Sequence, residues 1–292
     1  MKAAHWTAGP HETGASMFAP SRVELDQLAE AIRTHDLVDL STLALSTVLI
    51  PMDEAILQRC YSLCFHLWNE CDLVQLGNLA THLVSSGTLA PKDLDKFKEV
   101  RARAKQLRFI YAMLGSGHLY PPRLDRLTRI MGKVQDAVKH RRPLSTLVRA
   151  VLLRALLSRT ACSRLHQELR RFTPATLREV SANIITQASY LEHLCKISEV
   201  TDEEFHKGRK VVSRLVALSD VLIVLAPSYK QQITKRFLAT LNGLMGGLHD
   251  TMAERKAVDR SRYRTARTPI PEEIRSRMEV LVQAMQEVEI RT

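Results

Sequence analysis

The sequence predicts an all-α protein of about eleven or twelve helices, arranged as an irregular multi-helix bundle or an irregular helical solenoid. Apolar residues recur at helical spacing from about residue 21 to the end of the chain, and helix-capping residues separate the apolar runs. The continuous β-branched runs typical of strands are absent, and 11 Gly and 11 Pro are few for an all-β protein. The sequence contains no repeat of fixed period, so a regular repeat array is not predicted.

The helices of the front third are predicted from their caps and prolines. Ser21 and Glu24 form a capping box ahead of an apolar face. Asp36 is expected to cap a second helix that runs to about residue 50 and is closed by Pro51. Two further helices are expected, over 52–70 and from there to Ser86.

The middle of the chain predicts three helices joined by short breaks. Pro91 begins a long helix that ends at Gly115, and a Gly- and Pro-containing loop over 115–122 follows it. The next helix has a clean apolar face: Leu124, Leu127, Ile130, Val134 and Val138. Pro143 suits the first turn of a third helix, which holds Leu147, Val151, Arg154 and Leu157.

The last third is also predicted to be helical. Thr173 followed by Pro174 is expected to cap one helix, and a capping box of Thr201 with Glu204 is expected to begin another that Pro227 ends. Helices are then expected over 229–258 and 272–290. Glycines at 243, 246 and 247 predict either close packing against a neighbour or a bend in the 229–258 helix.

Composition and spacing predict five parts along the chain. They are a flexible N-terminal arm (1–20), an acidic helical subdomain (21–90), a basic helical core (91–258), an Arg-rich linker (259–271) and a C-terminal helix (272–292). The five cysteines, odd in number and without a secreted context, are interpreted as reduced thiols of an intracellular protein, cytoplasmic or nuclear.

The positive charge of the chain is concentrated in its middle. Residues 92–179 carry 21 Lys and Arg against 7 Asp and Glu, a surplus of 14, whereas the whole chain has a net charge of +11. Residues 1–91 carry 4 basic and 10 acidic residues. A surplus confined to one block produces a directional field, which indicates a polyanionic partner.

Two basic stripes are expected to carry the contact with that partner. On each of two successive helices the cations fall on one face, beside the apolar face, and an antiparallel hairpin of the two helices would join both stripes into one positive surface. The predicted nucleic-acid-binding residues are Lys98, Arg101, Lys105, Arg108, Arg123, Arg126, Arg129, Lys133, Arg141 and Arg142. A solvated helix face is the alternative interpretation. Arg262 and Arg264 are also predicted to bind nucleic acid, as part of a second basic cluster in which Tyr263 would stack on a base; a charged interdomain linker is the alternative there.

Groupings that suggest catalysis or metal binding are explained by packing. Cys60, Cys64 and Cys71 follow an apolar stripe that His66 does not share, so core packing is favoured over a zinc site. Cys162 and His166 stand four apart without an orienting acid. The loop 115–118 lacks the Lys-Ser/Thr of a phosphate-binding loop. No catalytic residue, metal or cofactor is therefore predicted.

The sequence favours a non-enzymatic protein that binds nucleic acid through phosphates, RNA rather than DNA, and that self-assembles as a homo-oligomer. Helical nucleocapsid and matrix proteins of viruses are similarly basic and free of catalytic motifs, and the comparison rests on composition alone. The first alternative is a protein-interaction scaffold in which Glu24, Asp26, Glu30, Asp36 and Asp39 pair with a basic neighbour. A lesser alternative is docking of the basic block to an acidic protein surface or an anionic membrane.

Overall fold

Two long helices, α4 (Pro91–Leu114) and α9 (Asp202–Leu225), lie at the centre of the computed structural model, which describes residues 18–42, 53–258 and 266–287. The other helices of the described residues are α1 (Arg22–Arg33), α2 (Glu54–Asn69), α3 (Leu73–Ser86), α5 (Pro122–Lys139), α6 (Pro143–Leu156), α7 (Arg159–Arg170), α8 (Leu177–Lys196), α10 (Tyr229–Val258) and α11 (Glu272–Gln286), with a short 3₁₀ turn η2 (Ser116–His118). The prediction of an all-α, multi-helix protein is confirmed.

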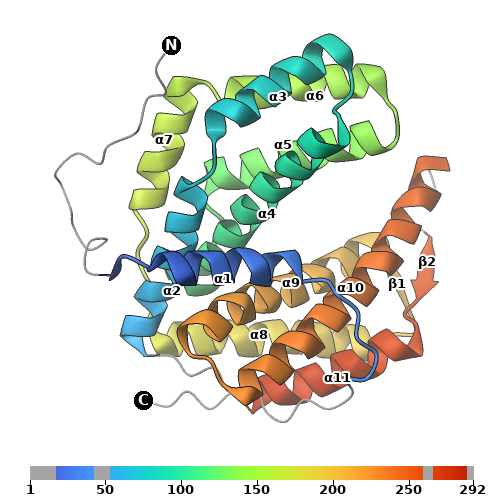
Figure 1. The fold of residues 1–292 in the computed structure, drawn as a ribbon. Coiled ribbons are helices and arrows are strands. Elements are labelled where there is room, and N and C mark those ends of the chain that lie inside the picture. Colours follow the sequence, from blue (N-terminus) through green and yellow to red (C-terminus); the bar gives the residue numbers. More distant parts are fainter. Residues whose placement is uncertain (1–17, 43–52, 259–265, 288–292) are drawn as a thin grey trace.

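The helices form two groups on either side of α4 (Figure 1). In the upper group of that view α6 packs on both α3 and α5, and in the lower group α10 packs on α9 and α11 packs on α8. The long central helices contact each other and join the groups. One connected cluster of buried apolar side chains extends from Leu25 to Met285. A junction between the two groups therefore runs along α4 and α9.

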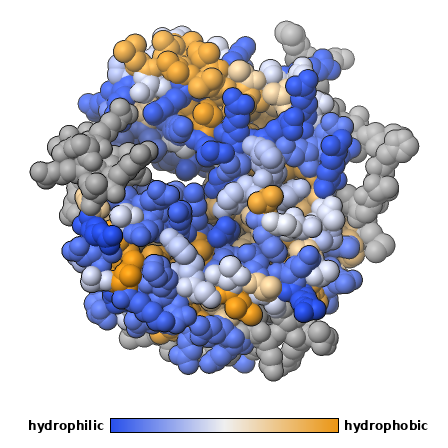
Figure 2. All heavy atoms as spheres, turned by 180° about the vertical axis from the view of Figure 1, so that it is seen from behind, coloured by the Kyte–Doolittle hydropathy of each residue, from blue (hydrophilic) through white to orange (hydrophobic). Residues whose placement is uncertain are grey.

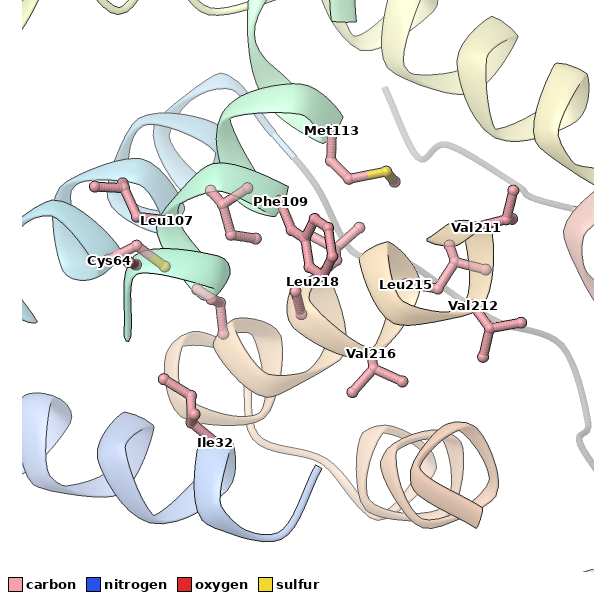
Figure 3. Packing of buried hydrophobic residues seen from close by; sticks show 14 of the residues in the cluster. Ile32, Cys64, Leu107, Phe109, Met113, Val211, Val212, Leu215, Val216 and Leu218 are labelled. Atoms are coloured by element: carbon pink, nitrogen blue, oxygen red, sulfur yellow. The ribbon is translucent and has the colours of Figure 1, made fainter. Parts of the chain in front are cut away.

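Apolar side chains on two faces of α4 form the middle of the core (Figure 3). Phe109 of α4 points toward Leu218 of α9, while Leu107, on another face of α4, lies toward Cys64 of α2. All four side chains are buried. Burial of one large apolar side chain stabilises a fold by about 1.5–3 kcal/mol. Because α4 is covered on two sides, only part of its surface remains for charged residues.

The predicted caps begin the helices where expected. In α1 the Ser21 hydroxyl accepts a hydrogen bond from the Glu24 amide at 3.2 Å, and the Glu24 carboxylate accepts one from the Ser21 amide at 2.7 Å. Thr201 and Glu204 make the same reciprocal pair at the start of α9. These caps satisfy amides that the first turn of a helix leaves without partners.

The predicted cap at Thr173 is wrong. Helix α8 begins at Leu177, and its capping box is formed by Thr176 and Glu179. Residues 173–175 are instead extended beside the end of α4, where the Ala175 amide donates to the Leu114 carbonyl and the Ser116 amide donates to the Thr173 carbonyl, each at 2.8 Å. These long-range hydrogen bonds outweigh the local helix-start signal.

The helix predicted from Asp36 is not formed in the described residues 37–42, and 43–52 lie outside the described part of the chain. This segment is held by α10. The Asp39 amide donates to the Thr240 hydroxyl at 2.9 Å, and Arg236 forms an ion pair with the Asp39 carboxylate at 2.5 Å. Because Asp39 is bound to α10, its amide does not enter a helical ladder.

Two three-residue strands appear where no strand was predicted. β1 (Glu199–Thr201) pairs antiparallel with β2 (Arg267–Pro269), and Val200 stands opposite Thr268. Such short strands carry no periodicity that a sequence can reveal. The C-terminal end of the predicted Arg-rich linker is therefore fixed to the start of α9. Among the described helices, none has the combination of length and apolar character needed to cross a bilayer.

Candidate polyanion-binding site

The basic stripe of α4 does not form an open surface. Lys98 is exposed and pairs with Asp95 of its own helix at 3.0 Å. Arg101, Lys105 and Arg108 are partly buried, because the surface of α4 beside its apolar face is covered by α5 and α9. The single positive wall expected from an α4–α5 hairpin is therefore absent, and the α4 cations lie in the junction between the helix groups.

Helix α9 adds cations to the same junction. Arg209, Lys210 and Arg214 are partly buried on the α9 surface that faces α4 and α5. We call the six residues the cationic seam: Arg101, Lys105 and Arg108 of α4 with Arg209, Lys210 and Arg214 of α9. Glycines leave room for two of the guanidinium groups. A Cβ at Gly132 of α5 would lie 3.0 Å from a terminal nitrogen of Arg101, and one at Gly246 of α10 would lie 3.3 Å from Arg209.

The seam residues perturb one another electrostatically. Burial lowers the pKa of Lys105 to about 7, and the neighbouring charges of Arg209, Arg101 and Arg108 add to that shift. Burial also lowers the pKa of Lys210, with Arg108 the next cause. Burial raises the free energy of the charged form of each side chain, and repulsion from neighbouring cations raises it further. An anion bound between these side chains would remove part of both penalties.

Four guanidinium groups in the seam have hydrogen-bonding capacity to spare. Within the described residues, the Nε atoms of Arg101, Arg108, Arg209 and Arg214 are buried and have no hydrogen-bond partner. A buried donor without an acceptor costs about 1–3 kcal/mol, and more when it is charged. The planar set of guanidinium donors matches the paired oxygen atoms of phosphates and carboxylates. The four arginines therefore carry an unrelieved desolvation cost in the fold as it stands.

One carboxylate and two aromatic rings hold the α5 end of the seam. Asp125 forms an ion pair with Arg108 at 2.8 Å and also pairs with the exposed Arg129. The Arg108 guanidinium lies 4.8 Å from the centroids of the Phe109 and Tyr120 rings. These contacts fix Arg108 in place. Asp136 also acts on Arg101, and Asp36 and Asp250 act on Arg209, so nearby carboxylates offset part of the positive charge of the seam.

His206 of α9 and His249 of α10 stand together near the seam, with ring centroids 5.1 Å apart. Burial lowers the pKa of both rings, that of His206 to about 4, and the charge of Lys210 adds to the His206 shift. Both rings are therefore neutral at pH 7, so they contribute polar atoms and no positive charge.

The cations predicted on α5 form a separate, exposed ridge that borders the seam. Arg126, Arg129 and Lys133 are exposed along α5, and we call them the α5 ridge. Arg129 is close enough to lower the pKa of Lys210, which connects the ridge to the seam. The remaining predicted residues are placed elsewhere: Arg123 pairs with Glu168 of α7 at 3.0 Å, Arg141 and Arg142 are exposed before α6, and Arg262 and Arg264 lie outside the described residues.

Core packing accounts for the buried cysteines, and contacts between helices account for the loop over 115–118. Cys60 and Cys64 are buried in the core, as their apolar stripe predicts, and burial raises the pKa of Cys60 to about 12. The described residues hold no cluster of three metal-binding side chains. His166 packs against Phe65, with ring centroids 5.4 Å apart. His118 of the loop lies 3.2 Å from the Glu179 carbonyl oxygen, so the loop joins α4 to α8.

Sequence reasoning missed the α9 cations. Residues 180–292 carry 17 basic and 14 acidic residues, so the charge of this block does not stand out. The usable signal was the spacing of Arg209, Lys210 and Arg214 on the surface beside an apolar face. The α9 cations form a cluster only together with those of α4, about 100 residues earlier, and only the fold brings the two helices together.

Comparisons with known proteins give no role that can be transferred to this site, since no family model, curated protein or solved structure matches the chain. The function of the cationic seam must therefore be inferred from its own chemistry.

Proposed function

We propose that this chain is a non-enzymatic nucleic-acid-binding protein that holds a phosphate backbone in the cationic seam and along the α5 ridge, with RNA favoured over DNA. The observation that carries the proposal is the convergence of six partly buried cations from two helices that contact each other, with buried guanidinium Nε atoms that have no partner in four of them. Several cations held in a row at one junction suit successive phosphates of a strand.

The recessed position of the seam favours a flexible single strand. Its cations are partly buried, so a phosphate there interacts in a medium of lower effective dielectric constant than bulk water. A single strand can bend to bring successive phosphates into a junction between helices, whereas a stiff duplex presents a convex surface. Aromatic residues make up only 5% of the chain, so base stacking contributes little and weak sequence preference is expected.

Electrostatic self-association has less support from the structure. Four of the five acidic residues expected to meet a basic partner are already paired within the chain: Glu24 with Arg59, Asp26 with Arg22, Glu30 with Arg33 and Asp39 with Arg236. A carboxylate that already has a cationic partner gains little from a second one. Self-association would therefore need a surface other than this acidic segment.

The proposal is tested with a fluorescently labelled single-stranded RNA and the double variant Lys210→Gln/Arg214→Gln. Loss of two phosphate contacts should weaken RNA binding by about 100-fold at low salt and should lower the slope of log affinity against log salt by about 1.4. The variant should fold with an unchanged or higher Tm, because it removes charge from a repulsive cluster. Anisotropy and thermal unfolding are the measurements.

The matched control is Arg164→Gln/Arg171→Gln, which removes two exposed cations at α7 and leaves the same net charge. It should bind RNA within about threefold of the wild type, because exposed charges away from the strand are screened. Equal losses in the two variants would mean that net charge alone drives binding, and the seam would then have no specific role. A DNA strand of the same sequence, measured in parallel, tests the preference for RNA.

A further inference from the structure

Helix α6 turns its apolar side outward. Its largest aliphatic residues are exposed, from Leu144 at 78% to Leu147 at 39%, while Thr146, Ala150 and Leu153 are the residues that it buries. The exposed residues are Leu144, Leu147, Val148, Val151 and Leu152, and we call them the α6 stripe. Helices on a protein surface normally bury such residues and expose polar ones. The side of α6 that meets α3 and α5 is thus less apolar than the side that meets solvent.

The α6 stripe is a continuous patch. Its positions follow the i, i+3, i+4, i+7, i+8 spacing, which places all five side chains on one helix face. The molecule seen from behind shows a broad apolar area at its top, where α6 lies in Figure 1 (Figure 2). Single exposed aliphatic residues are ordinary on a protein surface, whereas a contiguous patch of this kind marks an interaction site.

The chain segment that carries the stripe contains cations but no acidic residue, although Lys139 at its start pairs with Asp250 of α10 at 3.6 Å. Residues 137–167 contain no Asp or Glu, and they carry seven cations: Lys139, Arg141, Arg142, Arg149, Arg154, Arg159 and Arg164. Two of them are anchored beside the stripe. Arg149 donates to the Lys133 carbonyl at 2.7 Å, and Arg154 donates to the Thr81 hydroxyl of α3. Arg142, the residue before α6, and Arg159, the first residue of α7, are exposed.

We propose that the α6 stripe docks on an anionic lipid bilayer, with α6 lying in the plane of the membrane interface. An apolar helix face between cationic ends matches a surface that is apolar below its headgroups and negative at them. A second copy of this chain fits less well, because two-fold pairing of the stripe would bring the same cations face to face. The proposal uses none of the seam residues and does not depend on RNA binding.

The test is co-sedimentation of the full chain with two kinds of vesicle, phosphatidylcholine alone and phosphatidylcholine with about 30% phosphatidylserine. The wild-type chain should partition at least about 30-fold more strongly onto the vesicles that contain phosphatidylserine. Val148→Asn/Val151→Asn should reduce that partition by about tenfold or more. Arg142→Gln/Arg159→Gln should reduce it by about 30-fold, from a roughly fivefold contribution of each cation.

The matched control is Val23→Asn/Ile185→Asn, which makes the same change at exposed aliphatic residues of α1 and α8. It should bind vesicles as the wild type does. Equal binding of Val148→Asn/Val151→Asn and the wild type would overturn the proposal, as would equal binding of the wild type to both kinds of vesicle. A wild-type dimer that dissociates in Val148→Asn/Val151→Asn, without vesicle binding, would identify a second copy as the partner and would also overturn it.

Discussion

Lys105 of α4 and Asp220 of α9 line the same small cavity, of about 10 Å³, and burial shifts their pKa values in opposite directions until both are about 7. His35 and Gln106 also line this cavity. Asp220 is almost completely buried and has Lys235 of α10 at 3.1 Å as its ion-pair partner. Desolvation nevertheless outweighs the attraction of Lys235, so the carboxyl group retains its proton to a much higher pH than usual.

Asp220 should make the fold less stable as the pH rises from about 4 to about 7. In the unfolded chain its carboxyl group ionises near 3.8, while in the folded chain burial raises the pKa to about 7. Between these values the folded state binds more protons, so the free energy of unfolding falls with increasing pH, by at most about 1.4 kcal/mol per unit. The contribution is fully present below pH 3.8 and is lost as the pH passes through about 7.

The measurement is urea unfolding of the wild type and Asp220→Asn at several pH values. The difference in free energy of unfolding, wild type minus variant, should decrease between about pH 4 and 7. It should level off above about pH 7. Asp26→Asn, at an exposed carboxylate that pairs with Arg22, is the control for the loss of a surface carboxylate. If the difference in free energy of unfolding between the wild type and Asp220→Asn does not depend on pH, then the fold does not raise the pKa of the Asp220 carboxyl.

Lys105 should make RNA binding depend on pH. Its pKa is about 7 in the free protein because of burial and the neighbouring arginines, and a phosphate in the seam would raise it. Binding would then take up a proton above pH 7, so the affinity for RNA should fall between about pH 7 and 9, by at most tenfold per unit. His206, with a pKa of about 4, is already neutral in this range.

The variant Lys105→Met separates this effect from general charge loss. It should bind RNA more weakly at pH 6, and its affinity should change less between pH 7 and 9 than that of the wild type. Anisotropy at constant ionic strength gives both quantities. If Lys105→Met keeps the full wild-type pH dependence, then Lys105 is not the group that takes up the proton.

Two glycines of α10 should respond oppositely to alanine. A Cβ at Gly243 would lie 2.4 Å from the Asp36 carbonyl oxygen, so Gly243→Ala must displace the segment that follows α1. A Cβ at Gly247 meets no atom within 4 Å. We expect Gly243→Ala to lower the free energy of unfolding by about 1–3 kcal/mol and Gly247→Ala to raise it by about 0.5–1 kcal/mol. Urea unfolding measures both, and a stabilising Gly243→Ala would contradict the close approach of α10 to residue 36.

Much of the local structure follows from the sequence alone. The capping boxes at Ser21 and Thr201 and the prolines that begin α4 and α6 act within one or two helical turns, so no distant residue is needed to interpret them. The failures at Thr173 and Asp36 share one cause. Both segments form hydrogen bonds with residues far away in the chain, the first with the end of α4 and the second with α10.

The sequence by itself determined that the chain is helical, where most helices begin, and that its middle is strongly basic, because capping, periodicity and charge are local properties. Only the tertiary structure decided which face of each amphipathic helix is covered. It buried the cations of α4 against those of α9, and it left the α6 stripe exposed while α6 packed through Ala150 and Leu153. The physical reason is that periodicity defines a face, whereas the neighbours that cover the face come from distant parts of the chain.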